Sequence, residues 1–262
     1  MGRVLIVARE EYLGECKEIA EQYEVGFEIN DFSDPVVLEC EEETNRLIEF
    51  YQREGLPKGS TMHGAFFDIV VFSYDLRVRE IAELRMEQSM KIAVRLGVKG
   101  VVFHTNISPV LSGEEYDHRA IDMTVKYMAC LLQRYPDTEI YLENMFDANP
   151  DLLVAISERL CVYENYGVCF DYAHASISGT PMSEWVVALA PYIKHVHIND
   201  NHLKRDEHLA LGDGTIDWCK FVKYRETYFK SSSLLIETTL PQNQRRSLVY
   251  LEQNFEGILK RR

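Results

Sequence analysis

The sequence predicts a single (β/α)8 TIM barrel that spans residues 1–262. Short β-branched runs alternate with longer amphipathic stretches, a pattern typical of parallel strands joined by helical crossovers. Eight such runs occur in 262 residues, which is a normal length for one closed barrel. An open doubly wound sheet is the alternative. Against it, the segment VARE after the first run lacks a Gly-rich phosphate-binding turn.

The expected strands are rich in β-branched and aromatic residues. They cover residues 3–8, 25–30, 61–66, 100–105, 139–144, 167–172, 193–199 and 233–238. The clearest helix is 76–97, where apolar residues recur at helical spacing before a terminal glycine. A second helix, 148–160, opens on Asn149 as N-cap and Pro150 at the first helical position. The other helices are expected at 41–54, 116–135, 182–190 and 242–256.

Composition limits the classes of partner. The formal net charge is −14, whereas proteins that bind duplex DNA usually carry a basic face, so nucleic acid is disfavoured. No apolar run approaches the ~18 residues that are needed to cross a bilayer. The N-terminal run VLIVA also lacks a signal-peptide pattern. We therefore expect a cytoplasmic protein without a membrane partner. The cysteines show no CxxC spacing, so we expect them to be reduced thiols.

Residues of metal-binding type fall at the ends of six consecutive predicted strands. They are His63, His104, Glu143, Asp171, His197 and Glu237. His174 follows Asp171 by three residues, and Asp206 and His208 come after the seventh strand. Active sites of such barrels form at the carboxyl ends of the strands. We therefore expect all nine side chains to converge on one mouth.

A cation is the simplest explanation for this convergence. One histidine or glutamate at a barrel mouth is more often a structural residue than a ligand. Four carboxylates and five imidazoles together, however, would repel one another or bury unpaired charge. The donors are nitrogen and oxygen without thiolate, which suits Zn, Mn, Co or Fe(II) rather than a structural zinc cage. We predict one to three divalent ions per chain.

The remaining histidines are interpreted without a ligand role. The two-residue period of a strand places a second interior layer below the predicted ligands. This layer consists of Val102, Tyr141, Cys169, His195 and Leu235. Most of its members are apolar, as a filled barrel requires, and His195 is expected to be a core or supporting residue. His118 and His202 are expected in solvated loops.

The segment after the seventh strand is predicted to fold over the mouth. Asp206 and His208 are two residues apart, so an extended loop places both side chains on one side. We expect this flap to hold a second metal position or a substrate hydroxyl. Gly212 and Gly214 would permit the turn that folds it back, and Trp218 would pack beneath it.

With these residues in view, the chain resembles the xylose isomerase-like barrel superfamily over nearly its whole length. The most specific segments are VVFHTN, YLENM, GVCFDYAHA, HVHINDN, RDEHLALGDGTIDW and LLIET. The group includes sugar-phosphate isomerases and epimerases, inosose dehydratases and apurinic endonucleases of the endonuclease IV kind. In those endonucleases nine ligands hold three zinc ions, and all nine residues named above match their motif positions. In the sugar enzymes one metal is held at the positions of Glu143, Asp171, His197 and Glu237.

Three departures separate this chain from the endonucleases. Tyr172 stands where they have Ser or Thr, Phe66 stands where they have a Tyr used at the DNA, and the segment NDNHLK is shorter than their loop. Together with the negative charge, these differences favour a small sugar or sugar-phosphate substrate. An endonuclease that acts on abasic DNA and a metal-dependent polyol dehydratase stay as alternatives, and assembly into a homo-oligomer is left open.

The favoured chemistry is metal-dependent isomerisation or epimerisation. A metal that polarises a carbonyl stabilises the enediolate, which is the costly intermediate. Glu143 and Glu237 come from strands on either side of the mouth, so they can address opposite faces of one carbon. His174 or His197 would move protons or bind the substrate. The predicted catalytic residues are Glu143, Glu237 and His174.

Overall fold

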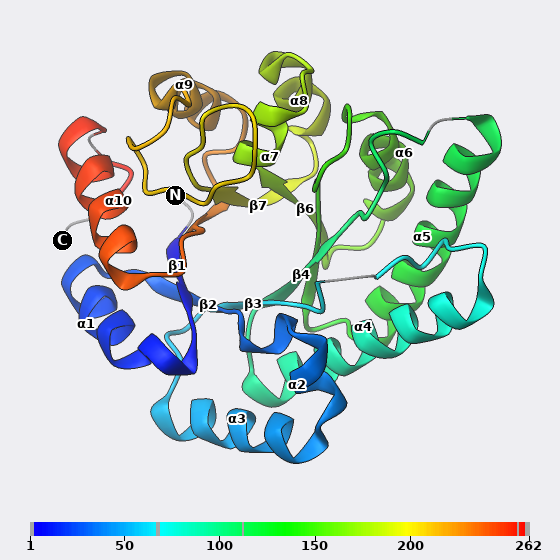
Figure 1. Ribbon diagram of the computed structural model, residues 1–262, viewed down its shortest axis with the longest axis horizontal. Coiled ribbons are helices and arrows are strands. Elements are labelled where there is room, and N and C mark those ends of the chain that lie inside the picture. Colours follow the sequence, from blue (N-terminus) through cyan, green and yellow to red (C-terminus); the bar gives the residue numbers. More distant parts are fainter. Residues whose placement is uncertain (1–2, 67–68, 112, 256, 260–262) are drawn as a thin grey trace.

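The computed structural model describes residues 3–66, 69–111, 113–255 and 257–259. Eight parallel strands form one closed barrel in sequence order, and β8 pairs with β1 to complete it (Figure 1). The strands are β1 (Val4–Ala8), β2 (Gly26–Ile29), β3 (Thr61–His63), β4 (Gly100–His104), β5 (Glu139–Glu143), β6 (Tyr166–Asp171), β7 (Ile193–Ile198) and β8 (Ser233–Ile236). The predicted (β/α)8 barrel is confirmed.

The strand ends differ from prediction mainly at β3. This strand ends at His63 rather than at residue 66. The Gly64 N–H still donates to the Val102 carbonyl at 2.8 Å, but the Phe66 N–H then donates to Ser33 in the loop after β2. The chain therefore leaves the ladder at the barrel mouth and turns toward its neighbouring loop.

Helices cover the outside of the barrel (Figure 1). Six were predicted: α3 (Glu41–Glu54), α4 (Leu76–Leu96), α5 (Glu114–Arg134), α6 (Asp151–Leu160), α8 (Met182–Leu189) and α10 (Pro241–Asn254). The last predicted residue of α10, position 256, lies outside the described residues. The α6 helix begins at Asp151 with Pro150 as its N-cap, one residue later than predicted, and the Asn149 side chain accepts a hydrogen bond from Asp151 N at 3.0 Å. His118, which we expected in a loop, is an exposed residue of α5.

Four helices and two 3-10 turns were not predicted. They are α1 (Leu13–Tyr23), α2 (Pro35–Glu39), α7 (Tyr172–Ile177), α9 (Trp218–Tyr228), η1 (Glu10–Tyr12) and η2 (Asp31–Ser33). The longer two escaped notice because each buries only three side chains in a mostly polar sequence. In α1 these are Leu13, Cys16 and Ile19. No helix in the described part of the chain is both long and apolar enough to cross a bilayer.

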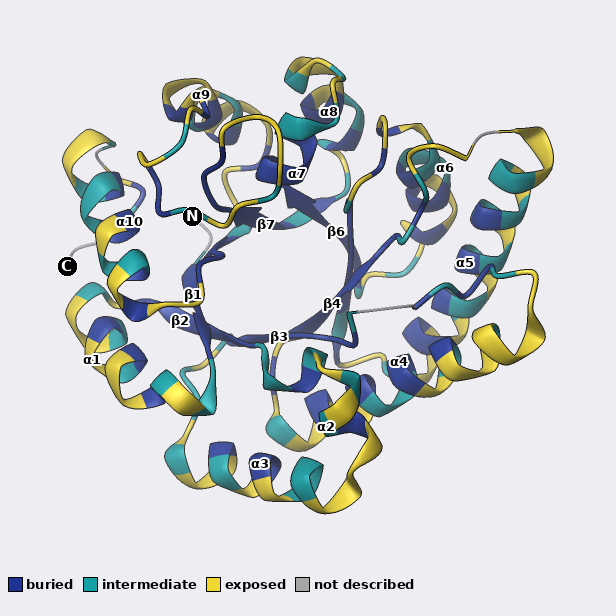
Figure 2. Ribbon diagram, in the orientation of Figure 1, coloured by how far each residue is buried: buried dark blue, intermediate teal, exposed yellow. Residues whose placement is uncertain are grey.

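Burial follows the expected layering. The strands are buried throughout, and the helices turn their buried faces toward them and their exposed faces outward (Figure 2). Inside the barrel, the predicted residues Val102, Tyr141 and Cys169 form one small apolar cluster. Leu235, also predicted, forms a second cluster with Leu5 and Val7, which were not predicted. His195 is fully buried among them and stacks on Tyr141 with ring centroids 5.2 Å apart, which confirms it as an interior residue.

Candidate metal centre

The nine predicted ligands converge at the carboxyl ends of the strands in three groups. Within each group the potential ligand atoms lie within 4.8 Å of one another. The central group is Glu143, Asp171, His197 and Glu237; the β3–β4 group is His63, His104 and Glu143; the loop group is His174, Asp206 and His208. Glu143 belongs to two groups. The fold therefore brings the nine predicted side chains to one mouth and divides them into three groups.

The central group concentrates buried acids around one imidazole. His197 Nδ1 lies 3.4 Å from Glu143 Oε2 and 3.4 Å from Glu237 Oε1. Burial and the carboxylates of Glu237 and Glu143 raise the pKa of Asp171 well above its ordinary value, although His174 opposes them. Burial would also raise the pKa of Glu237, but His197 and His208 outweigh it and lower the pKa to about 2. Without a cation, one acid of this group is driven to hold a proton.

The β3–β4 group presents two imidazole nitrogens to one carboxylate. His63 Nε2 lies 3.2 Å from His104 Nε2, and His104 Nε2 lies 3.3 Å from Glu143 Oε2. His63 Nδ1 lies 2.9 Å from the Gly64 carbonyl and can only donate to it. In the neutral ring this fixes the proton on Nδ1 and leaves the Nε2 lone pair free. Burial lowers the pKa of His104, which keeps that ring neutral as a ligand must be.

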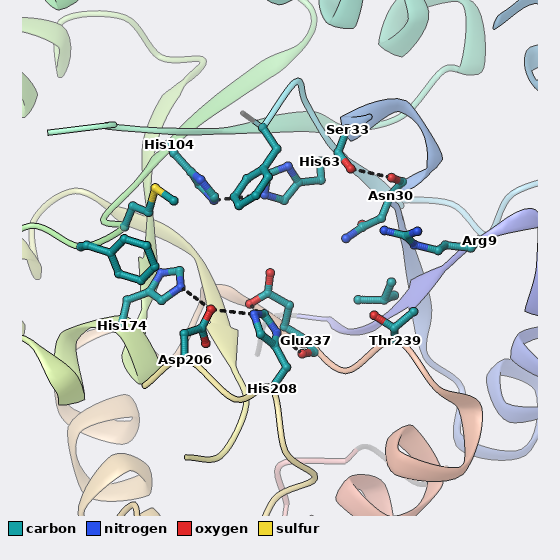
Figure 3. Close-up of a pocket in the computed structure, with 14 residues that line it drawn as sticks. Arg9, Asn30, Ser33, His63, His104, His174, Asp206, His208, Glu237 and Thr239 are labelled. Carbon is teal, nitrogen blue, oxygen red and sulfur yellow. Dashed lines mark hydrogen bonds and ion pairs between the residues drawn. The ribbon is translucent and has the colours of Figure 1, made fainter. Parts of the chain in front are cut away.

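The loop group follows the same design. His174 Nδ1 lies 3.0 Å from the Asn144 carbonyl, and His208 Nδ1 lies 2.9 Å from the Glu237 carbonyl. Both rings turn Nε2 toward Asp206 Oδ2, at 3.3 Å and 2.8 Å (Figure 3). Burial would lower the pKa of His208, but Glu237 and Asp206 raise it to about 10. The same carboxylates that favour a proton on His208 would attract a cation to this group.

Unpartnered buried atoms test whether a metal fits. Seven side-chain atoms of the predicted ligands are buried and have no hydrogen-bond partner among the described residues. They are His104 Nδ1, Glu143 Oε1 and Oε2, Asp171 Oδ2, His197 Nδ1 and Nε2, and Asp206 Oδ1. Leaving such groups unpaired is costly, whereas a divalent cation satisfies several of them at once. The nitrogen and oxygen donor set suits Zn, Mn, Co or Fe(II).

The loop between β7 and α9 places Asp206 and His208 as predicted. Asp200, which sequence reasoning missed, is fully buried and holds the loop closed. Its carboxylate accepts hydrogen bonds from Gly212 N at 2.8 Å, Ile216 N at 3.2 Å and Trp218 Nε1 at 3.0 Å. Gly212 has a φ of +89°, and Trp218 is buried under the loop. His202 lies exposed on the same loop, as expected.

A second missed residue supports the central group from inside the barrel. Glu28, on β2, is fully buried; its Oε2 accepts a hydrogen bond from Thr61 at 2.7 Å and lies 3.1 Å from His195 Nε2. Its Oε1 lies 3.3 Å from His197 Nε2. Burial favours the neutral acid, but the two imidazoles, His197 foremost, keep the pKa of Glu28 well below its ordinary value. Its only sequence signal is a lone acid in the apolar strand GFEI.

A cavity of about 340 Å³ opens above these groups (Figure 3). Six predicted ligands line it: His63, His104, His174, Asp206, His208 and Glu237. Apolar contacts come from Val7, Phe66, Met145 and Phe146, and further polar groups from Arg9, Asn30, Ser33 and Thr239. The other three ligands have no exposed surface and do not line the cavity, so they form the layer beneath its floor.

A family model, described as "Xylose isomerase-like TIM barrel", matches residues 20–252. The chain belongs to this family. One curated relative, the uncharacterised protein MJ1614 of Methanocaldococcus jannaschii, is 26% identical over 169 residues. That match covers 62% of this chain and 64% of the relative, so the chain spans less than two thirds of the relative's length.

Two solved structures of similar size share the xylose isomerase-like barrel. The TTHB071 protein of Thermus thermophilus, soaked with ZnCl2, has a TM-score of 0.78 and 22% identity, covering 95% of this chain and 96% of that one. A D-tagatose 3-epimerase-like protein has a TM-score of 0.74 and 22% identity, covering 96% of both chains. At this identity the likeness shows the fold, and the chemistry must be argued from the site.

Proposed function

We propose that the protein is a divalent-metal-dependent isomerase or epimerase of a sugar or sugar phosphate. One observation carries the proposal: Glu143 and Glu237 flank a metal-competent group at the floor of a cavity of about 340 Å³. Such a volume lies at the small end of ligand pockets, which suits a monosaccharide better than a polymer. The barrel it shares with a D-tagatose 3-epimerase-like protein supports this choice.

The central group would hold the catalytic ion through Glu143, Asp171, His197 and Glu237. Once bound, the ion would supply a Lewis acid that polarises a substrate carbonyl. Glu237 lines the cavity and stays ionised, so we assign it the removal of the proton from the carbon next to that carbonyl. Burial favours the neutral form of Glu143, but His197 and His104 lower its pKa well below the ordinary value. To return a proton to the opposite face, Glu143 would first have to take one from a neighbouring imidazolium such as His197, 3.4 Å away, with the substrate seated on the floor.

His174 would assist from the side of the cavity. Burial would lower its pKa, but Asp171, Asp206 and Glu143 raise it well above the ordinary value. A protonated His174 would donate a hydrogen bond to a substrate hydroxyl or carbonyl oxygen. If the loop group instead holds a second ion, His174 would act as its ligand and the substrate would be oriented by that ion.

Glu237→Gln tests the proposed chemistry. The change preserves side-chain volume but removes the basic carboxylate, so we expect about a 10³-fold loss of turnover with the fold intact. A panel of ketoses and their phosphates in D2O, followed by NMR, would report both product and exchange of the carbon-bound hydrogen. Glu49→Gln, an exposed change on α3, is the matched control. Near-normal turnover by Glu237→Gln would remove this residue from the proton transfer.

Phosphodiester cleavage at abasic DNA is the second candidate. The β3–β4 and loop groups provide up to two metal positions beyond the central one, more than a single proton transfer requires. Against it stands the net charge of −14, for which we expect nonspecific duplex binding no tighter than about 10⁻⁴ M. Incubating the same metal-loaded protein with an abasic duplex decides between the sugar isomerase and the nuclease. Nicking at catalytic rates would favour the nuclease.

A further inference from the structure

One side of the cavity carries an arginine that makes no direct ion pair with the described residues. Arg9 directly follows β1 and lines the cavity (Figure 3). Its Nε is buried without a hydrogen-bond partner, and its side chain makes no ion pair with any residue in the described ranges. Burying part of a guanidinium without a partner is unfavourable, so this arrangement calls for an anion that the chain itself does not supply.

Other arginines of the chain behave differently. Arg46, Arg134 and Arg159 each pair with a carboxylate at the surface. Asp31, in the loop after β2, attracts Arg9 electrostatically, but its Oδ2 is occupied by Glu10 N, at 3.0 Å, and by the Tyr51 hydroxyl. Arg9 therefore lies beside the cavity without a direct ion pair to any described residue.

Asn30 completes a donor site next to Arg9. It directly follows β2, and its N–H donates to the Ala8 carbonyl at 3.1 Å, which ties the ends of β1 and β2 together. Ser33 Oγ donates to the Asn30 carbonyl at 2.8 Å and fixes the turn. Figure 3 shows the Asn30 side chain beside Arg9 at the edge of the cavity, across from His174. Its Oδ1 is buried without a partner, which leaves the amide N–H groups to face the cavity.

We propose that Arg9 and Asn30, here called the β1–β2 subsite, bind an oxyanion on the substrate, a phosphate or a carboxylate. This inference rests on the proposed function and narrows its substrate class to acidic sugars. The Arg9 guanidinium offers donors only, and the Asn30 amide adds its N–H groups, so together they can make paired contacts to phosphate or carboxylate oxygens. Glu237 lies on the adjacent strand end, after β8, so the anionic end would be held beside the reacting carbon.

Comparing the binding of neutral and acidic sugars tests the subsite without any need for turnover. Isothermal titration of metal-loaded protein would compare D-fructose, D-fructose 6-phosphate and D-galacturonate. We expect wild type to bind at least one acidic sugar about tenfold more tightly than the neutral one, the worth of a charged hydrogen-bond pair. Arg9→Gln should remove that preference and leave fructose binding unchanged. Arg77→Gln, an exposed change of equal charge on α4, should keep it, and the preferred acid identifies phosphate or carboxylate.

Inorganic phosphate separates failure of the subsite from failure of the proposed function. The titration is repeated with phosphate alone, on metal-loaded and on chelator-treated protein. Arg9→Gln should raise the dissociation constant about fivefold in both states, whether or not any sugar is turned over. Phosphate affinity that is independent of Arg9, or an equal loss of neutral and acidic sugar binding, would overturn the subsite. Absence of sugar turnover with intact Arg9-dependent binding would count against the isomerase alone.

Discussion

Histidine orientation is set by two kinds of partner. His63, His174 and His208 each hold Nδ1 against a backbone carbonyl and present Nε2 to their group. His197 is reversed: its Nε2 faces the Glu28 carboxylate and its Nδ1 faces the central group. Partners of this kind fix which ring nitrogen is free to bind metal and raise its basicity.

Glu28→Gln should therefore weaken metal binding at the central group. The amide keeps the shape and one acceptor but loses the charge that favours a donor on His197 Nε2. We expect the affinity for Zn or Co to fall about 10–100-fold, measured by competition with a chelator. Glu49→Gln again provides the control. An unchanged dissociation constant would show that Glu28 only fills the barrel.

Asp147 gives a pH-dependent stability that one substitution can isolate. Burial raises its pKa to about 6, against hydrogen bonds from the Thr105 hydroxyl and Met145 N–H. In the unfolded chain the pKa of this carboxyl is near 4. The contribution of Asp147 to the free energy of unfolding is therefore complete below about pH 4 and is lost as pH rises through about 6.

Asp147→Asn keeps an acceptor for both hydrogen bonds and removes the buried charge. We expect the variant to gain about 2 kcal/mol relative to wild type between pH 4 and pH 7.5, measured by urea unfolding at both values. The variant gains stability over wild type as pH rises, and not as it falls, because the pKa of Asp147 is higher in the folded state than in the unfolded state. Parallel stability curves for the two proteins would refute a raised pKa at this position.

The loop between β7 and α9 acts as a folded unit because its glycines allow close backbone approach. A Cβ on Gly214 would overlap Asp200 Oδ1 and the Asn201 backbone. Asp200 in turn holds three donors of this loop. The position of Asp206 and His208 thus depends on contacts that neither residue makes.

Gly214→Ala should loosen this loop and the metal position it carries. We expect a loss of about 1–3 kcal/mol in unfolding free energy, since overpacking forces the backbone to shift. Elemental analysis should show fewer ions per chain. The control is Gly14→Ala in α1, where a Cβ meets nothing within 4 Å. Equal melting temperature and metal content for Gly214→Ala and wild type would contradict the proposed support.

The barrel as a whole should depend on its cation for stability. Three buried carboxylates and His197 meet in the central group, and several of their atoms have no hydrogen-bond partner among the described residues. A metal that binds only the folded state at a thousandfold excess over its dissociation constant adds about 4 kcal/mol.

Chelation should accordingly lower the melting temperature by about 10 °C for a protein of this size. Differential scanning calorimetry before chelation, after it, and after return of Zn or Mn would measure the effect. We also expect the purified protein to retain at least one divalent ion. No metal after growth in Zn and Mn, together with an unchanged melting temperature, would end the metal hypothesis.

Much of the candidate site was predictable because the topology of the barrel brings the carboxyl ends of all its strands together. Residues at the carboxyl ends of parallel strands meet at one rim, so His104, Glu143 and Asp171 could be assigned from strand ends alone. The two-residue period likewise predicted the interior layer beneath them. The helices α1 and α9 were missed because their apolar stripes are too narrow to show a period in the sequence.

The sequence by itself determined the fold class and predicted the nine candidate ligands, since strand periodicity and strand ends are local properties. Only the tertiary structure divided the ligands into three groups and brought in Glu28, which meets His195 across 167 positions of sequence. Arg9 was likewise silent, because an arginine after a strand is ordinarily a surface residue. Its Nε has no hydrogen-bond partner among the described residues, and such a gap can be recognised only from the positions of the neighbouring side chains.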